Sequence, residues 1–278
     1  MRLPVGVRVV LAPNPSIMTG PGTNTYIVTG ADALCAVIDP GPDDARHMEA
    51  ILRVTQAHGG VGAILVTHGH ADHDAGAGHL RALTGAPVLA FSRDGVATTD
   101  RTLADGEVVA VGGRVLRALH TPGHRYDHLC FLLEDADALF AGDLVAGVGT
   151  VVIVPPEGNI AEYLTSLERL LALPGLRTLL PAHGPVIEDG PALLREYIAH
   201  RLLREQQVLE GLRAGRDTIP QLVAEIYREV DPGLHGWASK SIAAHLLKLE
   251  REERVARAPG APEAGPWELR EPRANAEH

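Results

Sequence analysis

The chain has 278 residues, of which 45% are hydrophobic, and carries 25 Lys and Arg against 35 Asp and Glu. This length can bury one full hydrophobic core plus a small module, and the formal net charge of −10 opposes tight, non-specific binding to long nucleic acids, because phosphate contacts need Lys and Arg. Two cysteines give no disulfide framework, no apolar run reaches the ~18 residues that cross a membrane, and no signal-peptide pattern is present, so we expect a cytoplasmic protein without a membrane partner.

The first part of the chain alternates apolar runs with one amphipathic segment. Strands are predicted at Val5–Leu11, Tyr26–Val28, Leu34–Ile38 and Ala63–Val66, and a helix at Asp43–Ala57. The helix follows from apolar and small residues that recur along one face at helical spacing. Cys35 lies inside an apolar run, as Cys130 does further along, so both are expected to be buried structural thiols.

Directly after the fourth of these strands, a short block of the chain gathers metal-binding side chains: His68, His70, Asp72 and His73. Imidazole and carboxylate are borderline donors that suit zinc in particular. Residues two apart in an extended loop point to the same side, so His68 and His70 can share one ion. Asp72 and His73 lie where the chain turns toward a helix, with Asp74 as the expected N-cap, and can reach a second ion. The block therefore predicts a metal site.

More candidate ligands follow apolar stretches further along the chain. The elements predicted here are a helix at Gly78–Leu83, strands at Val88–Phe91, Glu107–Val111, Val115–Leu119, Leu129–Leu133, Ala138–Phe140 and Thr178–Leu180, and a helix at Ile160–Leu173. His124, Asp143 and His183 each stand in the loop after a predicted strand, where Gly or Pro fixes the turn. The order of strands and helices predicts two mixed sheets with helices outside them.

The chain changes character in its last third. Helices are predicted at Pro191–Arg213, Thr218–Tyr227 and Ala238–Glu252, and a two-stranded wing at Arg254–Ala258 and Trp267–Arg270. This pattern is typical of a winged-helix module, so we divide the chain into a domain of residues 1–190 and a module of residues 191–278. Leu202 and Leu203 of the long helix recur at helical spacing with other apolar residues and need a surface to cover them, so the module is expected to pack against the metal face.

The charge of this module bears on its role. Residues 193–258 carry 11 Lys and Arg against 10 Asp and Glu, whereas residues 1–192 carry 12 against 21. A dedicated DNA-binding module is usually clearly basic, so no stable DNA partner is expected. A structural or substrate-shaping role is therefore favoured over that of a nucleic-acid reader.

With its motifs in this order, the sequence resembles the metallo-beta-lactamase superfamily. The five motifs of that superfamily are matched by Asp39, the block from His68 to His73, His124, Asp143 and His183. The resemblance implies an α/β fold, a four-layer αββα sandwich with the metals at one edge of both sheets. It implies one metal held by His68, His70 and His124, and another held by Asp72, His73 and His183. Asp143 would bridge the two metals, and Asp39 would orient ligands from behind.

The residues present exclude three related groups. Common zinc beta-lactamases use a Cys ligand where this chain has an aspartate, so antibiotic hydrolysis is not expected as the native role. Flavodiiron relatives replace the second His of the block with Glu, whereas His70 is intact, which favours zinc over iron. Nucleases that cleave messenger-RNA ends carry a large domain between the bridging Asp and the last His, but only 39 residues separate Asp143 from His183.

Much of the chain is also similar to the beta-lactamase-like endoribonuclease of mitochondria and its bacterial relatives. The matching segments are Asn14-Pro15, Gly22-Thr23-Asn24-Thr25-Tyr26, the loops of His124, Asp143 and His183, His200-Arg201-x-x-Arg204-Glu205-Gln206-Gln207 and the winged-helix-like tail. The chain departs at Ala182, where Gly is usual, and at Arg125, where a small Thr is usual. Arg125 is therefore the candidate substrate-binding residue, because a guanidinium beside the metals can bind a phosphate.

The ligand set defines a reaction type but leaves the substrate open. Two zinc ions ~3.5–4 Å apart that share one water supply a bridging hydroxide as nucleophile and stabilise developing negative charge. We therefore expect a hydrolase with two zinc ions per chain and with Asp72 and Asp143 as catalytic carboxylates. The first hypothesis is phosphodiester hydrolysis of short single-stranded RNA. The second is hydrolysis of thioesters or other small acyl compounds, as in glyoxalase II or carrier-protein thioesterases. A non-catalytic scaffold is disfavoured because all the ligands are retained.

Overall fold

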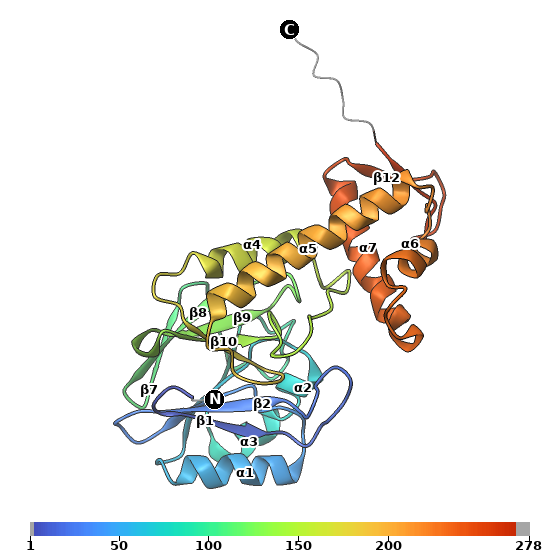
Figure 1. The fold of residues 1–278 in the computed structure, drawn as a ribbon. Helices are drawn as coiled ribbons and strands as arrows, with labels where there is room; N and C mark the ends of the chain where they lie inside the picture. Colours follow the sequence, from blue (N-terminus) through green and yellow to red (C-terminus); the bar gives the residue numbers. More distant parts are fainter. Residues whose placement is uncertain (1–2, 271–278) are drawn as a thin grey trace.

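A computed structural model describes residues 3–270 of the chain. Within that range the strands form a six-stranded, a five-stranded and a two-stranded sheet. The two large sheets stack face to face. Helices α1 (Ala45–Gln56) and α3 (Ala77–Thr84) lie outside the first, and α4 (Ile160–Leu171) and α5 (Gly190–Arg213) lie outside the second (Figure 1). This is the four-layer αββα sandwich that the family resemblance implies.

The six-stranded sheet has the strand order β1-β2-β3-β4-β5-β6. Its strands are β1 (Val7–Leu11), β2 (Asn24–Thr29), β3 (Cys35–Ile38), β4 (Val61–Leu65), β5 (Val88–Ala90) and β6 (Arg101–Thr102). β3 runs parallel to β4 and is buried along its whole length, which explains its continuous apolar sequence. α1 begins at Asp44, whose side chain accepts hydrogen bonds from two backbone N–H groups, and it buries Met48 and Ile51 against the sheet.

The five-stranded sheet has the strand order β11-β10-β9-β8-β7. Its strands are β7 (Val108–Val111), β8 (Arg114–His120), β9 (Leu129–Leu133), β10 (Ala138–Gly142) and β11 (Thr178–Pro181). β10 is fully buried and pairs in parallel with β11, so the two strands end at the same edge. α4 begins at Asn159, which caps its first turn, and buries Tyr163 and Leu167 on the outer face of this sheet.

The core between the sheets fixes the strand ends that carry the candidate ligands. Ile38 and Leu65 from the first sheet pack in one cluster with Phe131 and Phe140 from the second. All four side chains are at most 1% exposed. Because β4 and β10 are held on both faces by such contacts, the loops that follow them start from fixed positions. Cys35 and Cys130 are both buried and free, as predicted.

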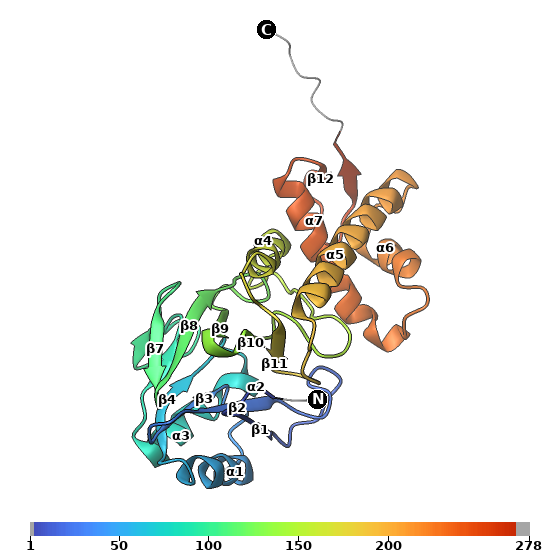
Figure 2. The same cartoon turned by 60° about the vertical axis from the view of Figure 1, so that its left-hand side comes forward.

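The C-terminal module is a winged helix connected through α5. It consists of the outer part of α5, α6 (Ile219–Ile226), η2 (Pro232–Leu234), α7 (His235–Arg251), β12 (Val255–Arg257) and β13 (Trp267–Leu269). Figure 2 shows α5 running from the outer layer of the sandwich into the module. Leu222, Ile242 and Trp267 form part of a separate core there. No helix in the described part of the chain has both the length and the apolarity needed to span a bilayer.

Three local features differ from the sequence-based predictions. A short helix α2 (Ala71–Asp74) begins at once after His70, so Asp74 lies inside that helix and is not an N-cap. The next helix, α3, begins after Gly76 instead. Leu202 and Leu203 are 50% and 51% exposed, because α5 turns other side chains inward. β6 has only two residues and was missed because its sequence is polar.

Candidate metal centre

The candidate ligands come from four loops that meet at one edge of the two sheets. His68 to His73 follow β4, His124 follows β8, Asp143 follows β10 and His183 follows β11. The two sheets are joined at this edge. The Asn24 backbone N–H donates to Ala182 O at 2.7 Å, and its side-chain amide donates to Gly184 O at 2.8 Å. The candidate ligands, which are far apart in sequence, therefore lie together at an edge whose position is fixed by these hydrogen bonds.

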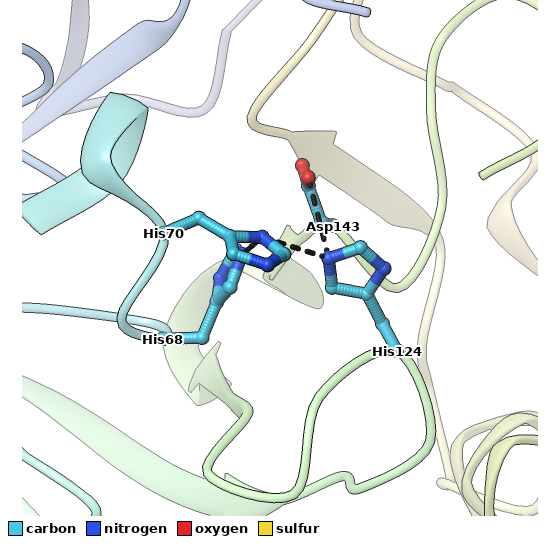
Figure 3. A group of neighbouring side chains, drawn as sticks. All are labelled: His68, His70, His124 and Asp143. Carbon is cyan, nitrogen blue, oxygen red and sulfur yellow. Dashed lines mark hydrogen bonds and ion pairs between the residues drawn. The ribbon is translucent and has the colours of Figure 1, made fainter. Parts of the chain in front are cut away.

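The first group consists of His68, His70, His124 and Asp143, whose donor atoms lie within 4.8 Å of one another (Figure 3). His68 Nε2 is 2.8 Å from His70 Nδ1, and His124 Nε2 is 3.2 Å from the same atom. Asp143 Oδ2 lies 3.7 Å from His124 Nε2. The remaining ring nitrogens face other partners: His68 Nδ1 faces the Thr67 hydroxyl at 3.0 Å, and His124 Nδ1 faces Val152 O at 3.1 Å.

The second group consists of Asp72, His73 and His183. His183 Nε2 lies 3.2 Å from Asp72 Oδ2 and 3.2 Å from Asp143 Oδ1. His73 Nε2 lies 3.5 Å from the same Asp143 oxygen. The two carboxylate oxygens of Asp143 thus face different groups, Oδ2 the first and Oδ1 the second. This is the placement expected of a bridging ligand.

The donor atoms fit metal ions. A tetrahedral zinc site has Zn–N distances of about 2.0–2.1 Å, which puts neighbouring ligand nitrogens at separations near those found between the rings of the first group. His73 Nε2 is buried and has no hydrogen-bond partner, although His73 Nδ1 is satisfied. An imidazole nitrogen held in this way, beside two carboxylates, is what a second cation would satisfy.

The electrostatics of the first group favour neutral imidazoles, the form that binds metal. Burial lowers the pKa of His68 well below its usual value, and the neighbouring His73 and His124 lower it further. Burial also lowers the pKa of His124 to about 4, against the opposing effect of Asp143. In the second group, burial is outweighed by Asp143 and Asp39, which raise the pKa of His73 well above its usual value.

Asp39 lies behind the ligands and connects them. Its Oδ1 accepts the Thr67 backbone N–H at 2.7 Å, and its Oδ2 accepts the Thr67 hydroxyl at 2.8 Å and lies 2.9 Å from His73 Nδ1. The side chain is almost fully buried, and its backbone has a positive φ of 51°, which is rare outside glycine. One strained residue therefore orients both His73 and the start of the ligand block.

Sequence reasoning missed His128. It is fully buried, its Nδ1 lies 2.9 Å from the Thr121 hydroxyl, and its Nε2 accepts the Asp143 backbone N–H at 3.1 Å. His128 thus fixes the backbone of Asp143 and belongs to neither group of candidate ligands. A single histidine just before β9 carries no motif, so only its three-dimensional contacts identify it.

Arg125 occupies a place other than the one expected. Its Nε donates to Asp127 Oδ1 at 2.6 Å, and a terminal nitrogen donates to Glu157 Oε2 at 2.6 Å. Arg125 is 8% exposed and does not line the cavity beside the metal ligands. Because both ends of the guanidinium are already paired with carboxylates, this geometry favours a positioning role over direct contact with a phosphate.

Asp127 in turn accepts the backbone N–H of Gly69 at 3.0 Å. Arg125 and Asp127 therefore connect the loop of His124 to the ligand block between His68 and His70. The hydrogen bonds of Asp127 are shielded from solvent, because this residue is only 1% exposed. Its contribution to the site is to hold two ligand loops in register.

A cavity of about 700 Å³ opens over the ligands. Five candidate ligands form part of its lining: His70, Asp72, His124, Asp143 and His183. The other walls are mainly apolar: Ile17 and Met18 precede β2, Trp237 comes from α7, and the segment between β10 and α4 contributes Val148, Val151, Val152 and Val154. No Lys or Arg among the described residues lines this cavity.

α5 holds the valine-rich wall in place. The Tyr197 hydroxyl donates to Gly149 O at 2.9 Å, and Arg201 donates to Val151 O at 2.5 Å. Arg201 is 2% exposed and stacks over the Tyr163 ring, with its Cζ 5.3 Å from the centroid. The wall of the cavity therefore depends on a helix that also belongs to the module, and Trp237 makes the module part of the site.

The chain belongs to the metallo-beta-lactamase superfamily, whose family model matches residues 18–183. A second model, the beta-lactamase associated winged helix domain, matches residues 218–267. Both fit the fold and the ligand geometry described above. The chain is accordingly a metal-dependent hydrolase of this superfamily with an associated winged helix.

Curated relatives share most of their length with this chain. The lactamase-like protein adaB of Aspergillus niger is 36% identical over 264 residues, covering 88% of this chain and 80% of the relative. The atrochrysone carboxyl ACP thioesterase of Aspergillus chevalieri is 35% identical over 259 residues, covering 89% and 82%. Among solved structures, a metallo-beta-lactamase family protein of Thermus thermophilus has the same fold, with a TM-score of 0.77 and 24% identity, covering 95% of this chain and 99% of that one.

These relatives correct the finer sequence-based interpretation. The expected relationship to an endoribonuclease, and with it RNA as substrate, is not supported; the activity named among these relatives is that of a carrier-protein thioesterase. The physical reason for the error is that the motifs used were metal ligands and structural residues. Arg201 and Glu205 of the motif that begins at His200, for example, make buried contacts within the protein and do not line the metal cavity, so they cannot identify a substrate.

Proposed function

We propose that this protein hydrolyses thioesters, and that its substrate is an apolar acyl group carried on a carrier protein. The observation that carries the proposal is the cavity over the ligands, which has apolar walls and no lining Lys or Arg among the described residues. An acyl thioester is uncharged at the reacting carbon and apolar beyond it. A phosphodiester is anionic, and apart from the proposed metal ions the cavity offers it no cationic side chain among the described residues. The thioesterase relatives point in the same direction.

We propose a separate role for each group of residues. We propose that His68, His70 and His124 hold one ion, that Asp72, His73 and His183 hold the other, and that Asp143 contacts both. Zinc suits this set of nitrogen and oxygen donors. The chemistry that such a pair supplies when bound is Lewis acidity, which lowers the pKa of water and withdraws charge from a carbonyl oxygen. Asp39 and His128 keep His73 and Asp143 in place through the hydrogen bonds described above.

The reaction breaks the C–S bond of the thioester. The acyl carbon gains an oxygen atom from water, and a carboxylic acid and a free thiol are released, with the second water proton going to the sulfur. Asp72 is the carboxylate available to accept a proton from that water, because it lines the floor of the cavity, whereas both oxygens of Asp143 already face the two groups of candidate ligands. The apolar walls hold the acyl chain and exclude bulk water from the carbonyl.

The test is a substrate panel on zinc-loaded protein, with thiol release as the readout. N-acetylcysteamine thioesters of a bulky aromatic acid and of acetate would be compared with a single-stranded RNA. We expect hydrolysis of the bulky thioester above all and no cleavage of RNA. Metal analysis should give about two equivalents of zinc per chain. Asp143→Ala should abolish hydrolysis and lower the metal content, whereas the exposed control Asp94→Ala should change neither. RNA cleavage without thioester hydrolysis would overturn the proposal.

A further inference from the structure

A second cavity, of about 290 Å³, lies beside the first. One side of this cavity is a single face of α7. Leu247, Lys248 and Arg251 follow Ala244 by three, four and seven residues, which places all four side chains on the same face of the helix. The wing contributes Arg257, and Pro155, Pro156 and residues 158–160 also line the cavity. We call this cavity the basic cleft.

The basic cleft and the metal cavity share a wall. Pro155 and Pro156 line both of them. The same segment contacts the ligand loop, because the Asn159 backbone N–H donates to Gly123 O at 2.8 Å, next to His124. A flexible molecule that reaches the ligands over Pro155 and Pro156 therefore passes the mouth of the basic cleft.

The charged groups of the cleft favour an anion. Lys248, Arg251 and Arg257 face it, against Glu263 alone. Lys248 is paired with Glu205 at 2.5 Å and with Glu252 at 2.8 Å, and Arg257 is paired with Glu250 at 3.2 Å. Arg251 is exposed, and no hydrogen bond or ion pair of its side chain is found among the described residues. A guanidinium left free in this way, on a chain with a net charge of −10, is available to a ligand.

We propose that the basic cleft binds the phosphodiester of a phosphopantetheine arm, with Arg251 as its principal contact. This inference rests on the proposed function, since a carrier protein presents its acyl thioester at the end of such an arm. The arm has one phosphodiester, at the carrier end, so the phosphate stays outside the cavity when the thioester reaches the ligands. In the described part of the chain, no Lys or Arg of the metal cavity is available to that phosphate. The basic cleft, across the shared wall, offers a free one.

The experiment compares substrates that share one acyl group and differ only along the arm: acyl-pantetheine, acyl-4′-phosphopantetheine and the acylated carrier protein. The readout is the ratio of kcat/KM for a phosphate-bearing substrate to kcat/KM for acyl-pantetheine. Arg251→Glu should lower this ratio about tenfold, for acyl-4′-phosphopantetheine as well as for the carrier, because a charge-assisted contact is replaced by repulsion. Arg251→Lys should lower it less. Arg228→Glu is the matched control, because Arg228 lies on the same module with its side chain 75% exposed and does not line the cleft.

Each other outcome overturns a defined statement. If the wild-type protein hydrolyses none of the three thioesters, the proposed function fails and this inference with it. If all three are hydrolysed and the ratio is the same for wild type, Arg251→Glu and Arg228→Glu, only the phosphate site is refuted. If Arg251→Glu impairs the carrier substrate but not acyl-4′-phosphopantetheine, Arg251 meets the carrier's surface, and the assignment of the phosphate is wrong.

Discussion

Asp39 Oδ2 lies 2.9 Å from His73 Nδ1, deep in the edge where the two sheets meet. The carboxylate accepts a hydrogen bond from Nδ1–H, so Nε2, which faces Asp72 and Asp143, is the nitrogen that gives up its proton when a cation binds. The role of Asp39 is therefore to select the tautomer of His73 as well as to hold its ring.

Asp39→Asn should weaken metal binding at the second group. An amide nitrogen facing His73 Nδ1 would force that atom to accept, which moves the proton to Nε2 and removes it as a ligand. We expect a loss of affinity of about 10- to 100-fold for the second metal equivalent, measured by metal titration with parallel assays of hydrolysis. Asp43→Asn, at a side chain that is 59% exposed, is the control. Unchanged binding of both equivalents would show that the tautomer argument is wrong.

Arg125→Ala should lower stability more than it changes substrate preference. The substitution leaves Asp127 buried without its cation, which costs about 3 kcal/mol in comparable buried pairs. Arg117→Ala, which removes a more exposed pair with Glu134, should cost about 0–1 kcal/mol. Denaturant unfolding measures both values. The ratio of the hydrolysis rate on a neutral thioester to that on an anionic thioester should be the same in Arg125→Ala as in wild type. A selective loss of activity on the anionic substrate would instead assign Arg125 to substrate binding.

Trp237→Ala should impair bulky substrates selectively. Trp237 comes from α7, is 41% exposed and lines the metal cavity, so it offers an aromatic surface to the acyl group. We expect KM for a bulky aromatic thioester to rise about tenfold, because apolar contact area is lost, with little change for an acetyl thioester. Leu269→Ala on the wing, where the side chain does not line the cavity, serves as the control. Equal effects on both thioesters would argue against a role in acyl selection.

His245 should make the module sensitive to acid. It is fully buried with neither ring nitrogen hydrogen-bonded, and burial, together with Arg201 and Lys248, lowers its pKa to about 3. The unfolded chain binds a proton there near pH 6.5, and the folded chain does not. His245 therefore leaves the free energy of unfolding unchanged above about pH 6.5. As the pH drops from about 6.5 toward 3, His245 lowers this free energy by at most about 1.4 kcal/mol per pH unit.

His245→Leu removes this proton uptake. Unfolding free energies measured from pH 7 to pH 4 should decline less steeply in His245→Leu than in wild type. The difference between the two slopes isolates this residue from the carboxylates that titrate in the same range. Identical slopes would mean that His245 is not kept neutral in the folded protein.

Local patterns in the sequence predicted two mixed sheets with outer helices and the metal-binding loops, and the family resemblance carried by the motifs implied the four-layer sandwich. Apolar runs of strand length ended in His or Asp, and a ligand block of that density has few other uses. The same patterns could not place Arg125, because its partners Asp127 and Glu157 are identified only once the loops have folded. They could not find His128 for the same reason. The walls of the metal cavity were the hardest part to predict from the sequence, because Ile17, Val148 and Trp237 are far apart along the chain and meet only in the folded protein.

Trp237 and the α5 contacts to Gly149 and Val151 mean that the apolar wall of the metal cavity is built partly outside the segment that carries the candidate metal ligands. If the proposed function holds, reactivity and selectivity are encoded in separable stretches of the gene. Substitutions in the winged helix would then change which acids are released while the candidate metal ligands stay intact. For protein engineering, exchanging α7 and its flanking turns between homologues is therefore a rational first route to altered substrate scope.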